Sequence, residues 1–169
     1  IAYAKADGRR GRMSCSATVG PGANNLVAAA AVAHINRLPL LLMPGDVFAN
    51  RRPDPVLQQV EDFGDGTVSA NDCFRPVSRY FDRLTRAEQV VPALQRAMAV
   101  LTDPAECGPV TLSFCQDVQT EAFDVPQSFF EERVWMPRRP GPDARELATA
   151  ADLLRRAARP LLIAGGGVL

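Results

Sequence analysis

The glycine-rich stretch Gly20-Pro21-Gly22-Ala23-Asn24-Asn25 is the segment of the sequence best suited to binding a ligand. It lies between a predicted strand at residues 12–18 and a predicted helix at residues 25–35. Glycines let a ligand approach the main chain, and the N-terminal amides of a helix open toward such a loop. A plain strand-to-helix turn would have the same composition, so both interpretations stay open. A Walker phosphate loop is excluded, because no Gly-Lys-Ser/Thr follows.

Asp46 is the second candidate, because it directly follows the apolar run LLLMPG. Ligands of open α/β sheets bind beyond the carboxyl ends of the strands, which places Asp46 where it could contact a substrate. The alternative is that its carboxylate caps a turn. The sole histidine, His34, lies in an apolar segment and is expected to pack there. Gly165-Gly166-Gly167 could open a nucleotide site, with a tight turn as the alternative.

Charge and cysteine content exclude several function classes. Lys and Arg together number 19, as do Asp and Glu, so no basic surface for nucleic acid or for an anionic membrane is indicated. The four cysteines form no Cys-x-x-Cys pair, which argues against a zinc site and fits the reducing cytoplasm. The longest apolar stretch, residues 26–33, is far too short to span a bilayer.

Strand and helix patterns alternate along the chain. Apolar runs predict strands at residues 12–18, 40–43, 109–114 and 161–164. Helices are predicted at residues 25–35, apolar on nearly all sides and therefore buried, and at residues 54–62, with Asp54 as cap and Pro55 at the first position. This order predicts an α/β fold: a parallel sheet of four or five strands in residues 12–118, with helices on both faces.

Two further helices are predicted from their capping residues. Thr85 and Glu88 form a capping box before a helical stretch that Pro92 divides. Asp143 and Glu146 cap an amphipathic helix whose apolar face should pack on the first domain or on another chain. Four prolines in residues 119–142 indicate an interdomain linker. We therefore expect a domain at 1–118, the linker at 119–142 and the start of a second α/β domain at 143–169.

Several segments together resemble one family, the thiamine-diphosphate-dependent enzymes related to acetohydroxyacid synthase and pyruvate oxidase. SATVGPGANNLVAAAAVA is similar to that family's TSGPGATNLVTGLADA, and CGPVTLSFCQDVQ to its GPVHLDIPKDVQ. PGDVFANRRPDPVLQQVE resembles the subfamily of trihydroxycyclohexane-1,2-dione hydrolases of myo-inositol catabolism. The resemblance covers essentially all 169 residues in order, with residues 1–118 as part of the pyrimidine-binding domain.

The resemblance implies a site and a cofactor. Thiamine diphosphate with Mg²⁺ would lie between subunits of a homodimer or homotetramer, with Gly20, Pro21, Gly22 and Asn25 facing the pyrimidine. Asp46 stands where the synthases have Gln, which puts their substrate contacts in doubt here. The activating glutamate would precede Ile1, and the Mg²⁺ and diphosphate ligands would follow Leu169. We therefore expect both ends to continue in a longer protein, and this chain alone to hold no catalytic residue, bind no cofactor and be inactive.

The resemblance leaves three reactions and one other class open. The first is hydrolytic opening of trihydroxycyclohexane-1,2-dione, a C–C bond cleavage. A malonate-semialdehyde type of decarboxylase and an acetolactate-synthase-like carboligase are the alternatives within the superfamily. A flavodoxin-like binding module without catalysis is the alternative outside it.

Overall fold

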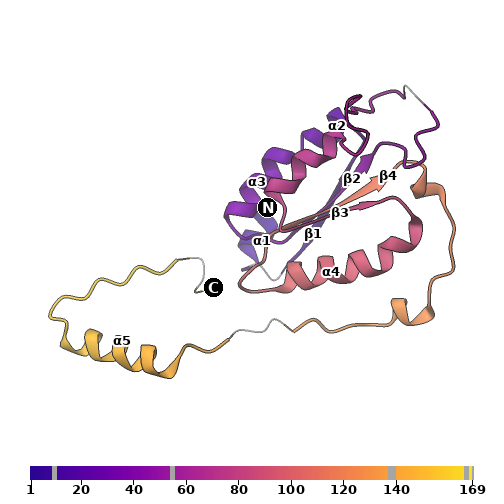
Figure 1. The fold of residues 1–169 in the computed structure, drawn as a ribbon. Helices are drawn as coiled ribbons and strands as arrows, with labels where there is room; N and C mark the ends of the chain where they lie inside the picture. Colours follow the sequence, from indigo (N-terminus) through magenta and orange to yellow (C-terminus); the bar gives the residue numbers. More distant parts are fainter. Residues whose placement is uncertain (9–10, 54–55, 137–139, 166–167, 169) are drawn as a thin grey trace.

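The computed structural model describes residues 1–8, 11–53, 56–136, 140–165 and 168, and contains one sheet flanked by helices (Figure 1). The strands are β1 (Met13–Ala17), β2 (Leu40–Asp46), β3 (Tyr80–Leu84) and β4 (Pro109–Cys115). The α-helices are α1 (Ala2–Ala6), α2 (Pro21–Asn24), α3 (Val27–Ile35), α4 (Val90–Thr102) and α5 (Ala144–Arg156). The 3-10 helices are η1 (Ala70–Val77), η2 (Ala87–Gln89), η3 (Val118–Thr120) and η4 (Gln127–Phe130).

The sheet has the strand order β1-β2-β4-β3, and every neighbouring pair is parallel. The two central strands are largely buried, whereas the edge strand β1 is partly exposed. Continuous apolar sequence in β2 and β4 follows from this position, because helices cover both faces of a parallel sheet. The predicted α/β fold with a parallel sheet is confirmed.

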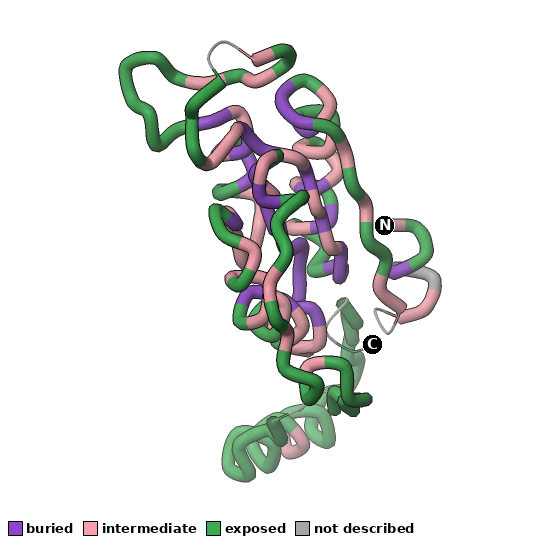
Figure 2. Tube along the Cα trace, turned by 90° about the vertical axis from the view of Figure 1, so that its right-hand side faces the viewer, coloured by how far each residue is buried: buried purple, intermediate pink, exposed green. Residues whose placement is uncertain are grey.

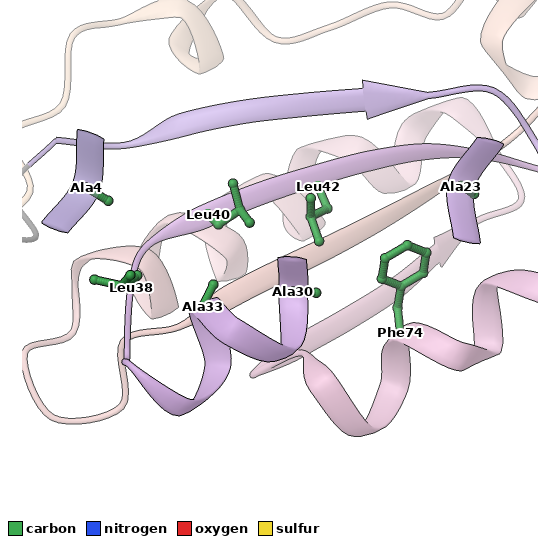
Figure 3. Packing of buried hydrophobic residues seen from close by; sticks show 8 residues of the cluster. All are labelled: Ala4, Ala23, Ala30, Ala33, Leu38, Leu40, Leu42 and Phe74. Carbon is green, nitrogen blue, oxygen red and sulfur yellow. The ribbon is translucent and has the colours of Figure 1, made fainter. Parts of the chain in front are cut away.

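One face of the sheet is covered by α2, α3 and η1 (Figure 1). The fully buried ring of Phe74, from η1, lies in one layer with Leu40 and Leu42 of β2 (Figure 3). Ala30 and Ala33 present no more than a methyl group to this layer, so α3 packs close to the sheet. This packing fixes the segment that leads from β1 to α3.

The opposite face is covered by α4. Ala93, Ala97 and Leu101 recur at four-residue spacing and form the buried stripe of this helix. They pack on Val110 and Leu112 of β4, which complete a second apolar cluster together with Leu84. The sheet is therefore the middle of three layers.

The helix α3 is less buried than its composition predicts. Ala30 and Ala33 are buried, but Val32 is 51% exposed and Ile35 is 82% exposed. The expectation of burial on nearly all sides is wrong, because α3 lies in the outer layer and only its sheet-facing stripe is covered within this chain.

Two predicted elements do not form. Residues 56–62 contain turns instead of a helix, and Gln58 has φ of 64°, outside the right-handed helical region; the predicted cap and first position, Asp54 and Pro55, lie outside the described residues. Residues 161–164 form no strand, because no other described strand pairs with them, and Leu161, Leu162 and Ile163 are exposed. Of the triple glycine, Gly166 and Gly167 lie outside the described residues.

The helix starts confirm one predicted cap and correct the other. The Asp143 carboxylate accepts hydrogen bonds from the backbone N–H groups of Arg145 and Glu146, as predicted. At the earlier helix, Gln89 replaces Glu88 as the capping side chain, because its Oε1 accepts from the Thr85 N–H at 2.7 Å. The boundary falls between η2 and α4, so Pro92 sits in the first turn of α4 and does not divide it.

The C-terminal part runs away from the sheet (Figure 1). Residues 131–136 are exposed, and so are the described residues of α5 apart from two that are half-buried (Figure 2). Leu147 and Leu154, on the apolar face of α5, are 55% and 47% exposed. The expected contact of this face with the first domain is therefore not made. Its contact with another chain stays a prediction, as do the linker at 119–142 and the second domain at 143–169.

Candidate functional site

A cleft of about 390 Å³ lies at the carboxyl ends of β1, β2 and β4. Parallel pairing aligns these ends, since Ala17 is opposite Pro44 and Asp46 is opposite Cys115. This edge is where open α/β sheets bind ligands. The cleft is lined by Ser16, Ala17, Thr18, Val19, Met43, Gly45, Phe114, Gln116 and Gln119.

The lining of this cleft is polar but carries no charged side chain among the described residues. Hydroxyl groups come from Ser16 and Thr18, and amides come from Gln116 and Gln119. Met43 and Phe114 add apolar surface. Such a lining suits an uncharged ring that carries hydrogen-bonding groups. A diphosphate would need cations from elsewhere, because phosphate recognition in proteins relies on Arg, Lys or a metal ion.

The backbone conformation and the close packing at Gly20 explain why this position is a glycine. It is buried, has φ of 64° and directly precedes α2, which begins at Pro21. A Cβ at this position would lie 1.9 Å from the carbonyl oxygen of Gln58. Both the left-handed backbone and the close approach of the segment around Gln58 require the absence of a side chain. No ligand is needed to explain this residue.

At Gly22 a Cβ would lie 2.3 Å from Cγ2 of the exposed Thr18, so a side chain there requires the Thr18 methyl group to move. Pro21 and Asn25 are exposed. None of the four predicted cofactor residues, Gly20 included, is among the described residues that line the cleft; Thr18 and Val19, just before them, do line it. The predicted loop therefore lies beside the cleft, and its contact with a cofactor stays a prediction.

Asp46 is at the same edge of the sheet, as predicted, but its carboxylate is occupied. It is 1% exposed, and its Oδ1 accepts from the Val47 N–H at 2.8 Å and from the Ser69 hydroxyl at 2.6 Å. Its Oδ2 accepts from the Ser113 hydroxyl at 2.6 Å and from Nε of Arg83 at 2.7 Å. Four donors match the four lone-pair sites of a carboxylate.

This saturation favours the structural interpretation of Asp46. Its neighbour Gly45 lines the cleft, where a Cβ would lie 3.2 Å from the Val19 nitrogen, but Asp46 itself is not a lining residue. Residues next to the glycine loop and next to Asp46 therefore line one cleft, whereas the predicted loop residues and Asp46 themselves do not. A contact between Asp46 and a substrate stays a prediction.

Arg83 joins Asp46 to a second carboxylate. Its Nη2 donates to Asp72 at 2.7 Å and to the Ser69 hydroxyl at 2.8 Å. Burial raises the pKa of Asp72, but hydrogen bonds from the Ser69 N–H, Arg83 and Arg75 outweigh burial, and the pKa lies below its usual value. The Asp46–Arg83–Asp72 network thus ties the carboxyl ends of β2 and β3 to η1.

The sequence offered no metal site, and the described residues include no cluster of three or more His, Cys, Asp or Glu able to hold a metal ion. His34 lies on α3, and its Nδ1 is buried without a hydrogen-bond partner among the described residues. His34 is not among the described residues that line the cleft, which supports its interpretation as a packed side chain.

Sequence reasoning missed the side chains that line the cleft. Gln116 and Gln119 follow β4 and could have been found by the same strand-end rule that selected Asp46. Ser16 and Thr18 could have been found because they end the strand before the glycine loop. The rule indicated the edge of the sheet at which this cleft lies, and the glycine loop drew attention to residues next to its lining.

Comparison with known proteins gives relatives over nearly the whole chain. A protein of Bacillus licheniformis named 3D-(3,5/4)-trihydroxycyclohexane-1,2-dione hydrolase is 51% identical over 167 residues, or 99% of this chain. Proteins of the same name from Geobacillus thermodenitrificans and Bacillus cereus are 51% and 49% identical over 168 residues. The chain spans 26% of the length of each of these relatives. No family model matches the chain.

These relatives confirm the resemblance found in the sequence motifs: the chain is homologous to proteins named as hydrolases of this dione. Among the described residues, no helix is long and apolar enough to cross a membrane.

Proposed function

We propose that this chain is part of a thiamine-diphosphate-dependent trihydroxycyclohexane-1,2-dione hydrolase, in which residues 1–118 provide the surface that receives the pyrimidine ring. The observation that carries the proposal is the identity of about 50% over 99% of the chain with proteins of that name. The neutral, polar cleft at the carboxyl edge of the sheet supports it.

The cleft residues fit the ring part of the cofactor and not its charged part. Ser16 and Thr18 hydroxyls and two glutamine amides can pair with ring nitrogens and an amino group, while Met43 contacts apolar ring atoms. When bound, thiamine diphosphate supplies an electron sink for breaking a C–C bond next to a carbonyl. The Mg²⁺ and diphosphate ligands belong, on this proposal, to another part of the protein, and the complete enzyme is a cytoplasmic homodimer or homotetramer.

The residues of this chain have a binding task. They orient the pyrimidine, exclude water from one of its sides and hold the rim of the cleft in place. The Asp46–Arg83–Asp72 network contributes rigidity, because it ties the carboxyl ends of β2 and β3 to η1. Electrostatic preorganisation of this kind is how a protein supports a cofactor that carries the chemistry.

The reaction is tested on the complete protein encoded by the gene. We expect the purified protein to open trihydroxycyclohexane-1,2-dione, and to lose this activity when thiamine diphosphate and Mg²⁺ are removed. Malonate semialdehyde and pyruvate, assayed alongside, distinguish the decarboxylase and carboligase alternatives. A protein that turns over none of these three substrates, and that binds flavin or no cofactor, would favour the flavodoxin-like binding module.

The location of the ring is tested with a matched pair of variants. Ser14 and Ser16 lie on the same side of β1 and are both exposed, but only Ser16 lines the cleft. A leucine at position 16 would fill part of the cleft, so Ser16→Leu should raise the Kd for thiamine diphosphate about tenfold or more. Ser14→Leu should leave it unchanged. Equal Kd values for both variants would place the ring elsewhere.

A further inference from the structure

The amide of Gln116, at the rim of the cleft, is held in one orientation by a relay of hydrogen bonds. The Phe48 N–H donates to Oε1 of Gln59 at 3.4 Å, and Nε2 of Gln59 donates to Oε1 of Gln116 at 3.2 Å. Each amide has one accepting and one donating end, so the direction of the first bond decides the direction of the second.

The backbone sets this polarity. If the Gln59 amide were turned over, its Nε2 would face the Phe48 N–H, and two donors would oppose each other. Oε1 of Gln59 must therefore face Phe48, and its Nε2 must face Gln116. Oε1 of Gln116 is then occupied, and its Nε2 has no partner among the described residues, so a donor is left for the cleft.

The relay rests on fixed backbone at both ends. The Asp117 carboxylate accepts from the N–H groups of Ala49 and Asn50 at 2.8 and 3.1 Å, which fixes the strand exit next to Phe48. The Gln116 N–H donates to the Asp46 carbonyl at 3.2 Å. The buried carboxylate of Asp46 in turn anchors this backbone through its own four bonds.

Gln119 presents the opposite polarity to the same cleft. Its Nε2 donates to the Phe114 carbonyl at 3.2 Å, which leaves its Oε1 as a free acceptor within the part of the chain that the structure describes. The rim thus offers one N–H donor from Gln116 and one carbonyl acceptor from Gln119, both uncharged. Such a pair matches a ring edge that carries an acceptor next to a donor.

We propose that Gln116 is a specificity-determining residue that donates to an acceptor on the uncharged ring in the cleft, and that Gln59 is its positioning residue. The inference rests on the proposed function and deepens it. Two rings of that function have the required edge: the aminopyrimidine of the cofactor, with a ring nitrogen next to an amino group, and the cyclic dione, with a ketone next to a hydroxyl group.

Three variants of the complete enzyme test the proposal. Gln116→Met removes the donor and keeps the length of the side chain. Gln59→Glu keeps Gln116 but replaces the donating amide at position 59 by a carboxylate, which can only accept. The Gln116 amide should then turn so that its Nε2 donates to this carboxylate and its Oε1 faces the cleft. Gln58→Glu is the control, because it adds the same charge next to position 59, on an exposed side chain that makes no hydrogen bond with the described residues. The Kd for thiamine diphosphate, by titration of the apo-enzyme, and the KM and kcat for the dione are measured for each.

Loss of one neutral hydrogen bond predicts a change of about threefold to tenfold in one binding constant for both Gln116→Met and Gln59→Glu. A higher Kd for the cofactor identifies the pyrimidine as the ring; a higher KM with unchanged Kd and kcat identifies the dione. The double variant that combines Gln116→Met with Gln59→Glu should lose no more affinity than Gln116→Met alone, because both changes act through the Gln116 amide.

The proposal is overturned if both constants stay within about twofold of wild type in Gln116→Met. An effect of Gln116→Met that Gln59→Glu does not share, or additive losses in the double variant, would overturn the positioning role of Gln59. Failure of the wild-type enzyme to act on the dione is a separate outcome, because it contradicts the proposed function before any variant is compared.

Discussion

At the scale of single residues, the surroundings of a side chain decide its chemistry more than its type does. Asp46 follows a strand as a ligand-binding residue would, yet four internal donors saturate its carboxylate. Gln116, an unremarkable polar residue in the sequence, keeps at the rim of the cleft a donor that no described residue accepts. The position of both residues could be predicted from the strand-end rule. Their hydrogen bonds could not, since the partners come from segments far apart in the chain.

Gly20 provides a first test at this scale. Gly20 and Gly8 have φ of 64° and 58°, but a Cβ at Gly20 would overlap the Gln58 carbonyl, whereas a Cβ at Gly8 meets no atom within 4 Å. Gly8→Ala should cost only the left-handed backbone strain, about 1 kcal/mol. Gly20→Ala should lower stability clearly more, measured as the difference in urea midpoint. Equal effects would show that the approach to Gln58 is not tight.

Cys115 provides a second test. Burial, together with the charges of Asp46 and Asp117, raises the pKa of its thiol to about 12. The thiolate is the reactive form, so Cys115 should resist iodoacetamide at pH 8, whereas the exposed Cys73 should be alkylated. Peptide mass spectrometry of the native protein measures both sites, with the denatured protein as control. Labelling of Cys115 as fast as Cys73 would contradict its burial.

At the scale of elements, apolar runs and capping residues were sufficient for most of the fold. β1, β2, β4 and the helices α3, α4 and α5 lie where the sequence pattern predicts them. The strand β3 was missed, because YFDRL has no apolar run: it is an edge strand whose Arg83 is satisfied inside an ion-pair network. The run at 161–164 was predicted as a strand but pairs with no described strand, and a strand needs a hydrogen-bonded neighbour as well as a suitable composition.

The Asp46–Arg83–Asp72 network gives the prediction that belongs to this scale. Arg83→Leu leaves the fully buried Asp46 carboxylate without its cation, which should cost about 3–5 kcal/mol. Arg79→Leu is the control, because its pair with the exposed Glu106, at 3.5 Å, should be worth less than about 1 kcal/mol. Urea denaturation of the complete protein compares the two. A similar midpoint for both variants would mean that water replaces Arg83 at no cost.

At the scale of the whole molecule, the proposed function makes this chain one part of a site. The cleft carries no charged side chain, and the described residues hold no metal cluster. Because the described lining of the cleft offers no cation to a diphosphate, we expect this chain alone, mixed with thiamine diphosphate and Mg²⁺, to form no product from the dione. A mass-spectrometric assay against the complete enzyme measures this. Cofactor-dependent product from the chain alone would contradict the division of the site.

The strand order has a consequence for synthesis on the ribosome. β2 lies between β1 and β4, and β4 is the last strand of the sheet to be made. A nascent chain that ends before β4 contains β1 and β2 but lacks the strand that pairs with Leu41 and Leu42 of β2. The long loop between β2 and β4 can close only after β4 has been translated. Until residue 115 leaves the exit tunnel, the half-sheet is an open apolar edge, which is the kind of surface that chaperones protect.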